Sequence, residues 1–319
     1  MVRVLAPPRR SAPRWLAVLA ATAALLSGCS QANASSPRLP TSSKPHPTSV
    51  TPPSGAKLQF KRLKGPAVVG ASMWSTSLHR VVHLVVYVPP GYNSAKSYPV
   101  LYLLHGVPGN APIMVEDLNL KSTLDRMISS REIAPMIVVA PSDGPLETTD
   151  TEWENSPIRP KWKWASLVAE DLVSWTQSSL PACPTRTGRA IGGLSMGAFG
   201  AINIALHYLD VFGSATLWSP YFIANTPSIE GPKGSQGWWD NSPLLYLPSM
   251  ISALRRMPLR ISYYSSPKNP GFYAQSLAFA KILTRNHIPF RFLIGGHSWP
   301  AWRSHFPSEM LWLSKDFHC

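Results

Sequence analysis

The sequence predicts an α/β fold with a mostly parallel central sheet that is covered by helices on both faces. Short apolar runs alternate with longer segments of helical periodicity, the pattern of strands that connect through helices to parallel neighbours. Val100–Leu104 and Pro135–Ala140 are continuous apolar runs, as expected for strands buried on both faces. A chain of 319 residues, 45% of them hydrophobic, is long enough for one large α/β domain with additional segments.

The first 28 residues are predicted to be an export signal. Four arginines precede the apolar run Trp15–Leu26, which is shorter than the ~20 residues that span a bilayer. The run ends at Leu26-Ser27-Gly28-Cys29, which resembles the lipobox of bacterial lipoproteins. We therefore expect Cys29 to become a lipidated N-terminus; an ordinary signal peptide that contains a cysteine is the alternative.

Residues 29–56 are rich in Ser, Pro and Thr and have no apolar period, so they predict a disordered tether. We expect an exported protein, lipid-anchored to the outer face of the bacterial cell membrane, with its folded domain at 57–319. After residue 28 the chain carries ten more basic than acidic residues. Without a basic helix or a stripe of basic and aromatic residues, this charge indicates a surface near anionic lipid or cell-wall polymer rather than a nucleic-acid-binding protein.

Within the domain, each predicted element follows from local composition. Short segments rich in β-branched or apolar residues predict strands. Strands are expected at Arg80–Tyr87, Val100–Leu104, Pro135–Ala140, Ala190–Ile191, Ser214–Trp218, Leu259–Tyr264 and Phe290–Ile294. Helices are expected at Leu118–Ile128, Trp164–Leu180, Ala198–Leu206 and Tyr273–Arg285, followed by a final helix from near His297 to Cys319. Residues 219–258 are predicted to be loop-rich and to cover the site as a lid.

The motif Gly193-Leu194-Ser195-Met196-Gly197 predicts a nucleophile elbow. It stands between a short apolar strand and a helix, which is the context that gives Gly-x-Ser-x-Gly its meaning. The turn needs a strained backbone, and Cβ atoms at Gly193 and Gly197 are expected to collide with the adjacent strand and helix. The Ser195 hydroxyl is then presented at a helix N-terminus, where free N–H groups favour a developing negative charge.

Three motifs, in order along residues 65–315, resemble the esterase D and antigen 85 branch of the α/β-hydrolase superfamily. They are the Tyr98–Gly106 stretch, the elbow with Phe199-Gly200-Ala201, and Gly295-Gly296-His297-Ser298-Trp299 with Trp302. The resemblance implies the α/β-hydrolase fold, with Ser195 as nucleophile and His297 as its base. Backbone N–H groups of Met196 and Val107 are expected to form the oxyanion hole, since Pro108 has no N–H.

The sequence leaves open which residue completes a Ser-His-acid triad with Ser195 and His297. The family pattern implies a carboxylate after the strand Leu259–Tyr264, where this sequence has Asn269. An amide can still accept a hydrogen bond from His297, although it supplies no charge. Alternatively a carboxylate comes from the loop after the preceding strand, and Asp240 or Glu230 in the 219–258 region are the candidates.

The remaining assignments concern aromatic residues and cysteines. Trp153, Trp299 and Trp302 are candidates to line the mouth of the site. Cys183 and Cys319 are both expected at the sheet edge opposite the catalytic one, and an exported domain favours a disulfide between them; two free thiols are the alternative. The spacing of His and Cys residues matches no metal motif, so neither a metal nor a cofactor is expected.

Together these observations predict a serine esterase that hydrolyses carboxylic esters, with a lipid or sugar ester among the candidate substrates. Two alternatives remain. The resemblance to antigen 85 proteins implies an acyltransferase to a sugar acceptor, and the missing acid favours a non-catalytic envelope-binding protein. The sequence leaves the oligomeric state open.

Overall fold

The computed structural model describes residues 65–144, 148–317 and 319. The predicted signal peptide, Cys29 and the predicted tether lie outside these residues. None of the described helices is long and apolar enough to cross a membrane.

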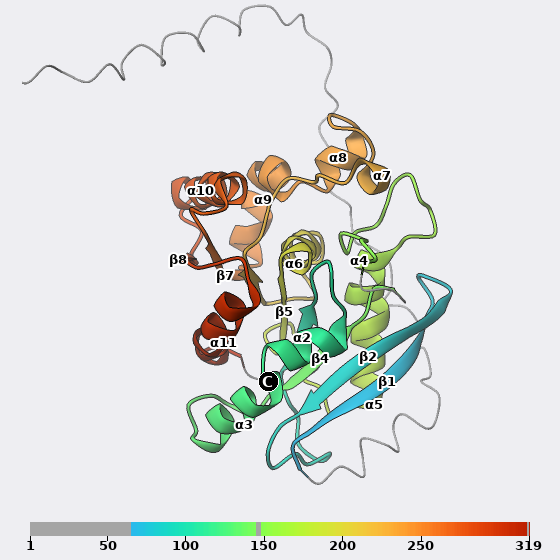
Figure 1. Ribbon diagram of the computed structural model, residues 1–319, viewed down its shortest axis with the longest axis vertical. Coiled ribbons are helices and arrows are strands. Elements are labelled where there is room, and N and C mark those ends of the chain that lie inside the picture. The colour runs from blue at the N-terminus through green and yellow to red at the C-terminus, as the bar shows by residue number, and fades with distance from the viewer. Residues whose placement is uncertain (1–64, 145–147, 318) are drawn as a thin grey trace, which may run out of the picture. The chain divides into compact units, whose positions relative to one another are not determined.

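Eight strands form one sheet, which is parallel except at the edge formed by β1 and β2 (Figure 1). The spatial order is β1-β2-β4-β3-β5-β6-β7-β8. The strands are β1 (Ala67–Ser75), β2 (Arg80–Val88), β3 (Val100–Leu104), β4 (Ile137–Pro141), β5 (Arg189–Leu194), β6 (Ser214–Trp218), β7 (Arg260–Ser265) and β8 (Phe290–Ile294). The predicted mostly parallel sheet is confirmed. The sequence analysis missed β1, because an edge strand with one exposed face lacks the continuous apolar run of a buried strand.

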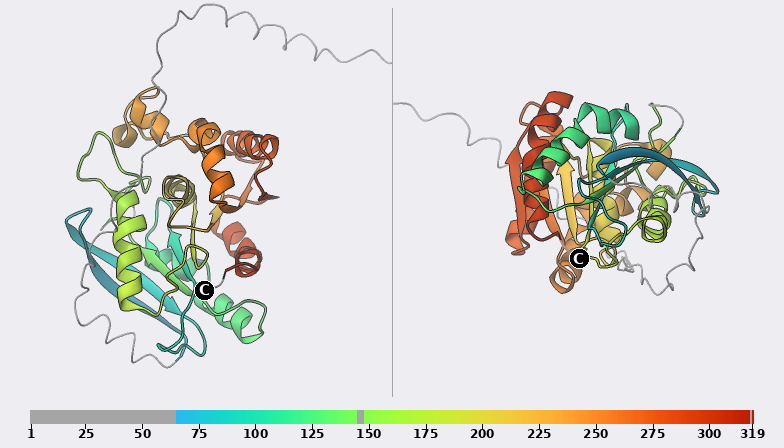
Figure 2. Two further views of the ribbon diagram at one scale, coloured as in Figure 1. Left: turned by 180° about the vertical axis from the view of Figure 1, so that it is seen from behind. Right: turned by 90° about the horizontal axis from the view of Figure 1, so that it is seen from below.

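Helices cover both faces of the sheet, as predicted (Figures 1 and 2). One face carries α2 (Ala111–Asp117), α3 (Leu120–Ser129) and α11 (Trp299–Ser314). The other carries α4 (Trp164–Ser166), the π-helical segment η1 (Leu167–Leu172), α5 (Val173–Ser179), α6 (Met196–His207), α9 (Pro243–Arg256) and α10 (Pro270–Arg285). The strand β3 shows how the two cores arise. Val100, Tyr102 and Leu104 pack on the second face and Leu101 and Leu103 on the first, because side chains alternate across a strand.

The segment 219–258 is more helical than its composition predicts. It contains α7 (Pro227–Glu230) and α8 (Gln236–Asp240) as well as the 14-residue α9. Leu247, Ile251 and Leu254 recur at helical spacing on α9 and are buried in the core beside α6 and α10. The prediction of a loop-rich stretch is therefore wrong for residues 243–256, which form part of the core.

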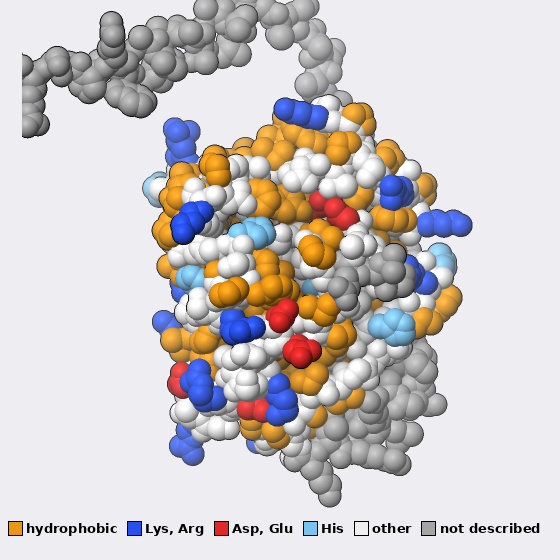
Figure 3. All heavy atoms as spheres, viewed as in Figure 1, with side chains coloured by type: hydrophobic (Ala, Val, Ile, Leu, Met, Phe, Trp, Pro, Cys, Tyr) orange, Lys and Arg blue, Asp and Glu red, His pale blue; other side chains and the backbone are white. Residues whose placement is uncertain are grey.

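Basic side chains are spread over the face of the molecule drawn in Figure 3. Lys and Arg lie mainly around the rim of this face, with hydrophobic and uncharged polar side chains between them. On this face the excess of basic over acidic residues is thus distributed rather than gathered into one patch.

Candidate active site

Ser195 lies on a strained turn between β5 and α6. Its φ of 54° and ψ of −119° are unfavourable for a residue with a side chain, which is the backbone signature of a nucleophile elbow. The glycines have the predicted role: a Cβ at Gly193 would lie 2.4 Å from the Gly197 backbone, and a Cβ at Gly197 would lie 2.2 Å from the Leu104 carbonyl oxygen. The N–H of Ser195 donates to the carbonyl of Trp218 at 2.9 Å, which ties the turn to the end of β6.

The loop after β3 lies directly beside Ser195. A Cβ added at Gly106 would be 3.1 Å from the Ser195 Cβ and 2.9 Å from the Leu194 carbonyl oxygen, so only glycine allows this approach. In the part of the chain that the structure describes, the backbone N–H groups of Met196 and Val107 form no backbone hydrogen bond in a turn, loop or helix cap. Neither N–H has a backbone acceptor there, and the predicted oxyanion hole stays a prediction.

His105 fixes the start of this loop from within the core. Its Nδ1 lies 2.9 Å from the Gly106 carbonyl oxygen, and its Nε2 lies 3.3 Å from Asp143 Oδ1. The indole N–H of Trp153 donates to the His105 carbonyl at 3.1 Å. Trp153 is fully buried, so its expected place in the mouth of the site is wrong. It supports the loop after β3 instead.

His297 follows β8 and lies between two aromatic rings. The centroid of its imidazole is 5.6 Å from that of Phe272 and 5.3 Å from that of Trp302. His297 is exposed to solvent on its open side, and partial desolvation of its ring by these neighbours lowers its pKa below its usual value of 6.5. Within the described chain, neither His297 nor the Ser195 hydroxyl has a side-chain hydrogen-bond partner, and Ser195 remains partly exposed. Hydrogen bonds between catalytic groups are often long in ligand-free enzymes and shorten when substrate binds.

Asn269 begins α10 on the side of the site where His297 lies. It is the N-cap residue of that helix, and Phe272 in the first turn contacts the His297 ring. The ends of β7 and β8 are joined by a hydrogen bond from the Gly295 N–H to the Ser265 carbonyl at 3.0 Å. The Asn269 side chain is half-buried and forms no hydrogen bond with any described residue. It occupies the predicted acid position without holding His297.

The two alternative acids lie elsewhere. Asp240 is exposed, accepts a hydrogen bond from Gln236, and acts electrostatically on His207, the last residue of the 12-residue helix α6. Because α6 starts next to Ser195 and rises ~1.5 Å per residue, His207 is about 16 Å along the helix from the site. Glu230 is buried in a cluster of carboxylates. Neither carboxylate is among the groups that shift the pKa of His297.

A residue that the sequence analysis did not single out lies between the Ser195 turn and the loop that carries His297. Ser219 directly follows β6, and its hydroxyl donates to the carbonyl of Gly296 at 2.7 Å. The signal that could have identified it is its place after a strand at the catalytic edge of a parallel sheet, where ligands and catalytic groups gather.

Comparisons with known proteins identify the family. A family model described as "Putative esterase" matches residues 75–313, which is more than half of the chain. The chain belongs to this esterase family. Endo-1,4-beta-xylanase Y of Acetivibrio thermocellus is 27% identical over 188 residues, or 58% of this chain and 16% of that protein. Esterase MT1326 of Mycobacterium tuberculosis is 29% identical over 139 residues (41% and 27%), and S-formylglutathione hydrolase of Arabidopsis thaliana is 28% identical over 156 residues (42% and 50%). The matched regions thus span between 16% and 50% of these relatives.

Solved structures confirm the α/β-hydrolase fold of this esterase-family chain. A ferulic acid esterase superposes with a TM-score of 0.70 at 23% identity, covering 80% of this chain and 100% of that one. MPT51 of Mycobacterium tuberculosis superposes with a TM-score of 0.63 at 16% identity, covering 79% and 99%. At these identities the likeness concerns the fold alone.

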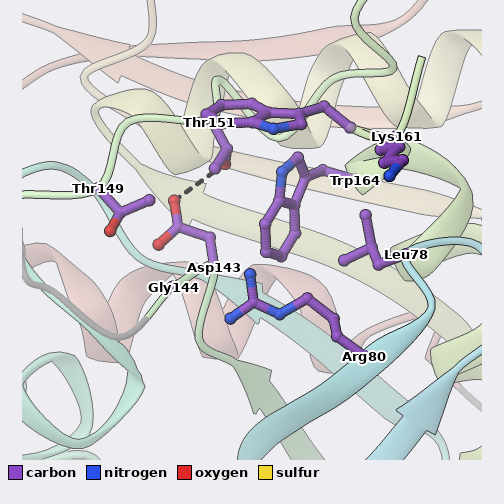
Figure 4. Close-up of a pocket in the computed structure, with 9 residues that line it drawn as sticks. Leu78, Arg80, Asp143, Gly144, Thr149, Thr151, Lys161 and Trp164 are labelled. Atoms are coloured by element: carbon purple, nitrogen blue, oxygen red, sulfur yellow. Dashed lines mark hydrogen bonds between the residues drawn. The ribbon is translucent and has the colours of Figure 1, made fainter. Parts of the chain in front are cut away.

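This family member has a cavity of about 200 Å³ behind the loop that follows β4 (Figure 4). Asp143, which contacts His105, lies in its wall and accepts a hydrogen bond from Thr151 at 2.9 Å. In Figure 4 the Arg80 guanidinium points toward Asp143, and the Trp164 indole lies beside it. His105 therefore connects this cavity wall to the loop after β3.

A buried carboxylate cluster lies beneath the 219–258 segment. Glu152 accepts hydrogen bonds from Tyr221 and Thr226, whereas both side-chain oxygens of Glu154 have no partner among the described residues. Burial raises the pKa of Glu152 to about 7 and that of Glu154 to about 10, and neighbouring carboxylates add to both effects. Burial also raises the pKa of Glu230. Burial thus favours the protonated form of all three acids, most strongly for Glu154.

Cys183 and Cys319 are free thiols in this structure and lie next to each other. Cys183 is buried and Cys319 exposed, and the Cys319 thiol lies 3.5 Å from the Ser97 hydroxyl. Burial and the neighbouring Cys183 thiol raise the pKa of Cys319 to about 11. The predicted disulfide stays a prediction.

Proposed function

We propose that this protein is a serine esterase that hydrolyses carboxylic esters through an acyl-Ser195 intermediate. The observation that carries the proposal is the strained Ser195 at the N-terminus of α6, with the Gly106–Val107 loop beside it. That arrangement exposes a nucleophile next to two free backbone donors, and strain of this kind persists where a site requires it.

The reaction follows from the positions of these groups. Ser195 Oγ attacks the ester carbonyl while His297 takes its proton, and the N–H groups of Met196 and Val107 bind the oxyanion. When the tetrahedral intermediate collapses, His297 returns the proton to the leaving alcohol and the acyl group remains on Ser195. Water then attacks the acyl-enzyme, with His297 again as base, and the carboxylic acid leaves.

The proposed location is the cell envelope. A lipidated Cys29 and a tether at 29–56 would hold the domain at the outer face of the membrane, close to lipid and sugar esters. The aromatic residues near His297, among them Phe272, Trp299 and Trp302, would provide apolar walls for an acyl chain or an aromatic acid.

A second candidate is a non-catalytic envelope-binding protein. The observation that favours it is the lack of any carboxylate partner of His297 in the described part of the chain. Replacing the triad aspartate by asparagine lowers kcat by about 10⁴ in a serine protease. A chain with asparagine in this position is therefore expected to lack much of the catalytic rate of a complete triad.

Covalent labelling separates these candidates. The mature chain is treated with a fluorophosphonate, in parallel with Ser195→Ala, and hydrolysis of p-nitrophenyl acetate is followed. The esterase predicts labelling and hydrolysis that both disappear in Ser195→Ala. Lack of labelling of the natural sequence would contradict the esterase and support the binding protein. Addition of trehalose to the same assay tests acyl transfer, because an acceptor sugar would divert the product from free acid to ester.

A further inference from the structure

Ser219 has the contacts of a residue that holds other groups in place. It is 2% exposed, and its φ of 57° lies in the left-handed region. A non-glycine residue is strained there, and such strain persists only where the surrounding structure fixes the residue. The hydrogen bonds of Ser219 explain what fixes it.

Three hydrogen bonds join Ser219 to three separate segments. Its N–H donates to the Tyr264 carbonyl at the end of β7 at 2.9 Å. Its hydroxyl donates to the Gly296 carbonyl at 2.7 Å and accepts the indole N–H of Trp302 at 3.2 Å. The residue before it, Trp218, accepts the N–H of Ser195. Two consecutive residues therefore hold both the nucleophile turn and the loop that carries the base.

The two groups bound by the Ser219 hydroxyl are those that determine where the imidazole lies. Gly296 directly precedes His297, and Trp302 forms one of the two rings that flank it. In the described part of the chain, no hydrogen bond and no carboxylate holds the His297 ring itself. Its position is thus determined by the backbone at Gly296 and by the neighbouring rings.

We propose that Ser219 is the positioning residue of His297 and performs the orienting role that a carboxylate has in a triad. This inference rests on the proposed esterase function. The hydroxyl acts on the backbone of Gly296 and on Trp302, not on the imidazole, so it orients the base without adding negative charge beside it. Displacement of a catalytic group by about 1 Å can cost about 10² in rate, which sets the scale of the contribution.

The test measures kinetics of the mature chain with Ser219→Ala. We expect kcat to fall by about 10- to 100-fold with little change in KM, because the base moves while the substrate site stays intact. The acid limb of kcat/KM should also shift to higher pH, toward 6.5, since a loosened His297 gains solvent and the burial that lowers its pKa is relieved. Ser219→Cys, which keeps a group of similar shape with weak hydrogen bonding, should recover part of kcat.

Trp302→Phe provides a second variant, useful also if Ser219→Ala folds poorly. It keeps an aromatic ring beside His297, although a smaller one, and removes the indole N–H that donates to the Ser219 hydroxyl. The same upward shift of the acid limb is expected. The double variant should lose less activity than the product of the two single effects, because both substitutions break one network.

Ser156→Ala is the matched control. Ser156 is also fully buried, and its hydroxyl donates to the Ile229 carbonyl and accepts the Arg159 N–H, away from His297. We expect it to lower stability without changing kcat or the pH profile. Unchanged kcat and acid limb in both Ser219→Ala and Trp302→Phe, or losses that only follow the melting temperature as in Ser156→Ala, would overturn the positioning role. Failure of the proposed function is a different result, because the natural sequence itself would then neither label nor hydrolyse esters.

Discussion

The indole N–H of Trp153 donates to the backbone carbonyl of His105 across 3.1 Å, so a fully buried aromatic residue supports the loop that lies beside Ser195. Trp153 itself adopts a φ of 53°, and a Cβ on Gly200 of α6 would lie 2.4 Å from its own Cβ. The loop after β3 and helix α6 are thus packed against the same side chain.

Trp153→Phe is expected to weaken both stability and catalysis. It retains most of the ring but leaves the buried His105 carbonyl without its donor, at a cost of about 1–3 kcal/mol. Since the carbonyl belongs to the loop that carries the Val107 N–H, we also expect a several-fold drop in kcat. Thermal unfolding and ester hydrolysis measure the two effects. An unchanged kcat at reduced stability would show that the loop keeps its geometry without this bond.

Asn269→Asp is expected to increase kcat. The new carboxylate would lie at the N-terminus of α10, where the helix dipole favours it, and next to the turn whose Phe272 contacts His297. A gain of about tenfold or more is expected, with the ~10⁴ effect of the reverse change in a serine protease as the upper limit. Asp240→Asn is the control and should leave kcat unchanged, because Asp240 acts on His207 at the far end of α6. A loss in Asp240→Asn together with no gain in Asn269→Asp would reverse this assignment.

The pH profile of kcat/KM should show a single acid limb below pH 6.5. His297 must be neutral to accept the Ser195 proton, and burial lowers its pKa from 6.5. Activity is therefore lost as the pH falls through this lowered value and is retained at pH 7. A limb at or above 6.5 in the natural sequence would mean that the imidazole is solvated or paired with an acid in solution.

Glu154→Gln should make stability less dependent on pH. The folded protein holds the proton of Glu154 up to a pKa of about 10, whereas the unfolded chain releases it near 4.5. Between these values the folded state binds more protons, so stability falls as the pH rises, by at most ~1.4 kcal/mol per pH unit for one group. Glutamine carries no such proton, so the stability of the variant relative to the natural protein should increase as the pH rises from 5 to 8.

Melting temperatures from pH 5 to pH 8 measure this difference. Glu132→Gln serves as the control, since Glu132 is exposed and pairs with Arg126 at the surface. Equal pH dependence of the natural protein and Glu154→Gln would indicate that the buried carboxylate is solvated or otherwise paired.

Oxidation of the exported protein should join Cys183 to Cys319. The two thiols lie next to each other, and the bond would close a long loop that in the chain-entropy model adds about 4–5 kcal/mol of stability. Peptide mapping without reductant should find the crosslinked pair, and reductant should lower the melting temperature of the natural protein but not of Cys183→Ser. Two free thiols after oxidation would contradict the pairing.

The sequence alone was sufficient for the features that depend on neighbouring residues. The continuous apolar run Val100–Leu104 located β3 to the residue, because a strand buried on both faces needs apolar side chains throughout. The spacing of Gly193, Ser195 and Gly197 was sufficient for the elbow, because the steric demand of a tight turn is local. The loops that carry Val107, Asn269 and His297 each follow a predicted parallel strand. Because the carboxyl ends of parallel strands share one edge of the sheet, the sequence also placed these three loops at one edge.

Only the tertiary structure decided which side chains meet at that edge. Asp240 and Glu230 were sequence candidates for the acid, yet one lies near the far end of α6 and the other in a buried carboxylate cluster. Trp153 was expected at the mouth and is in the core, whereas Ser219 had no motif and holds the base loop. Such contacts join residues up to about eighty positions apart, and their geometry depends on how helices and loops pack over the whole sheet, which no local pattern of residues encodes.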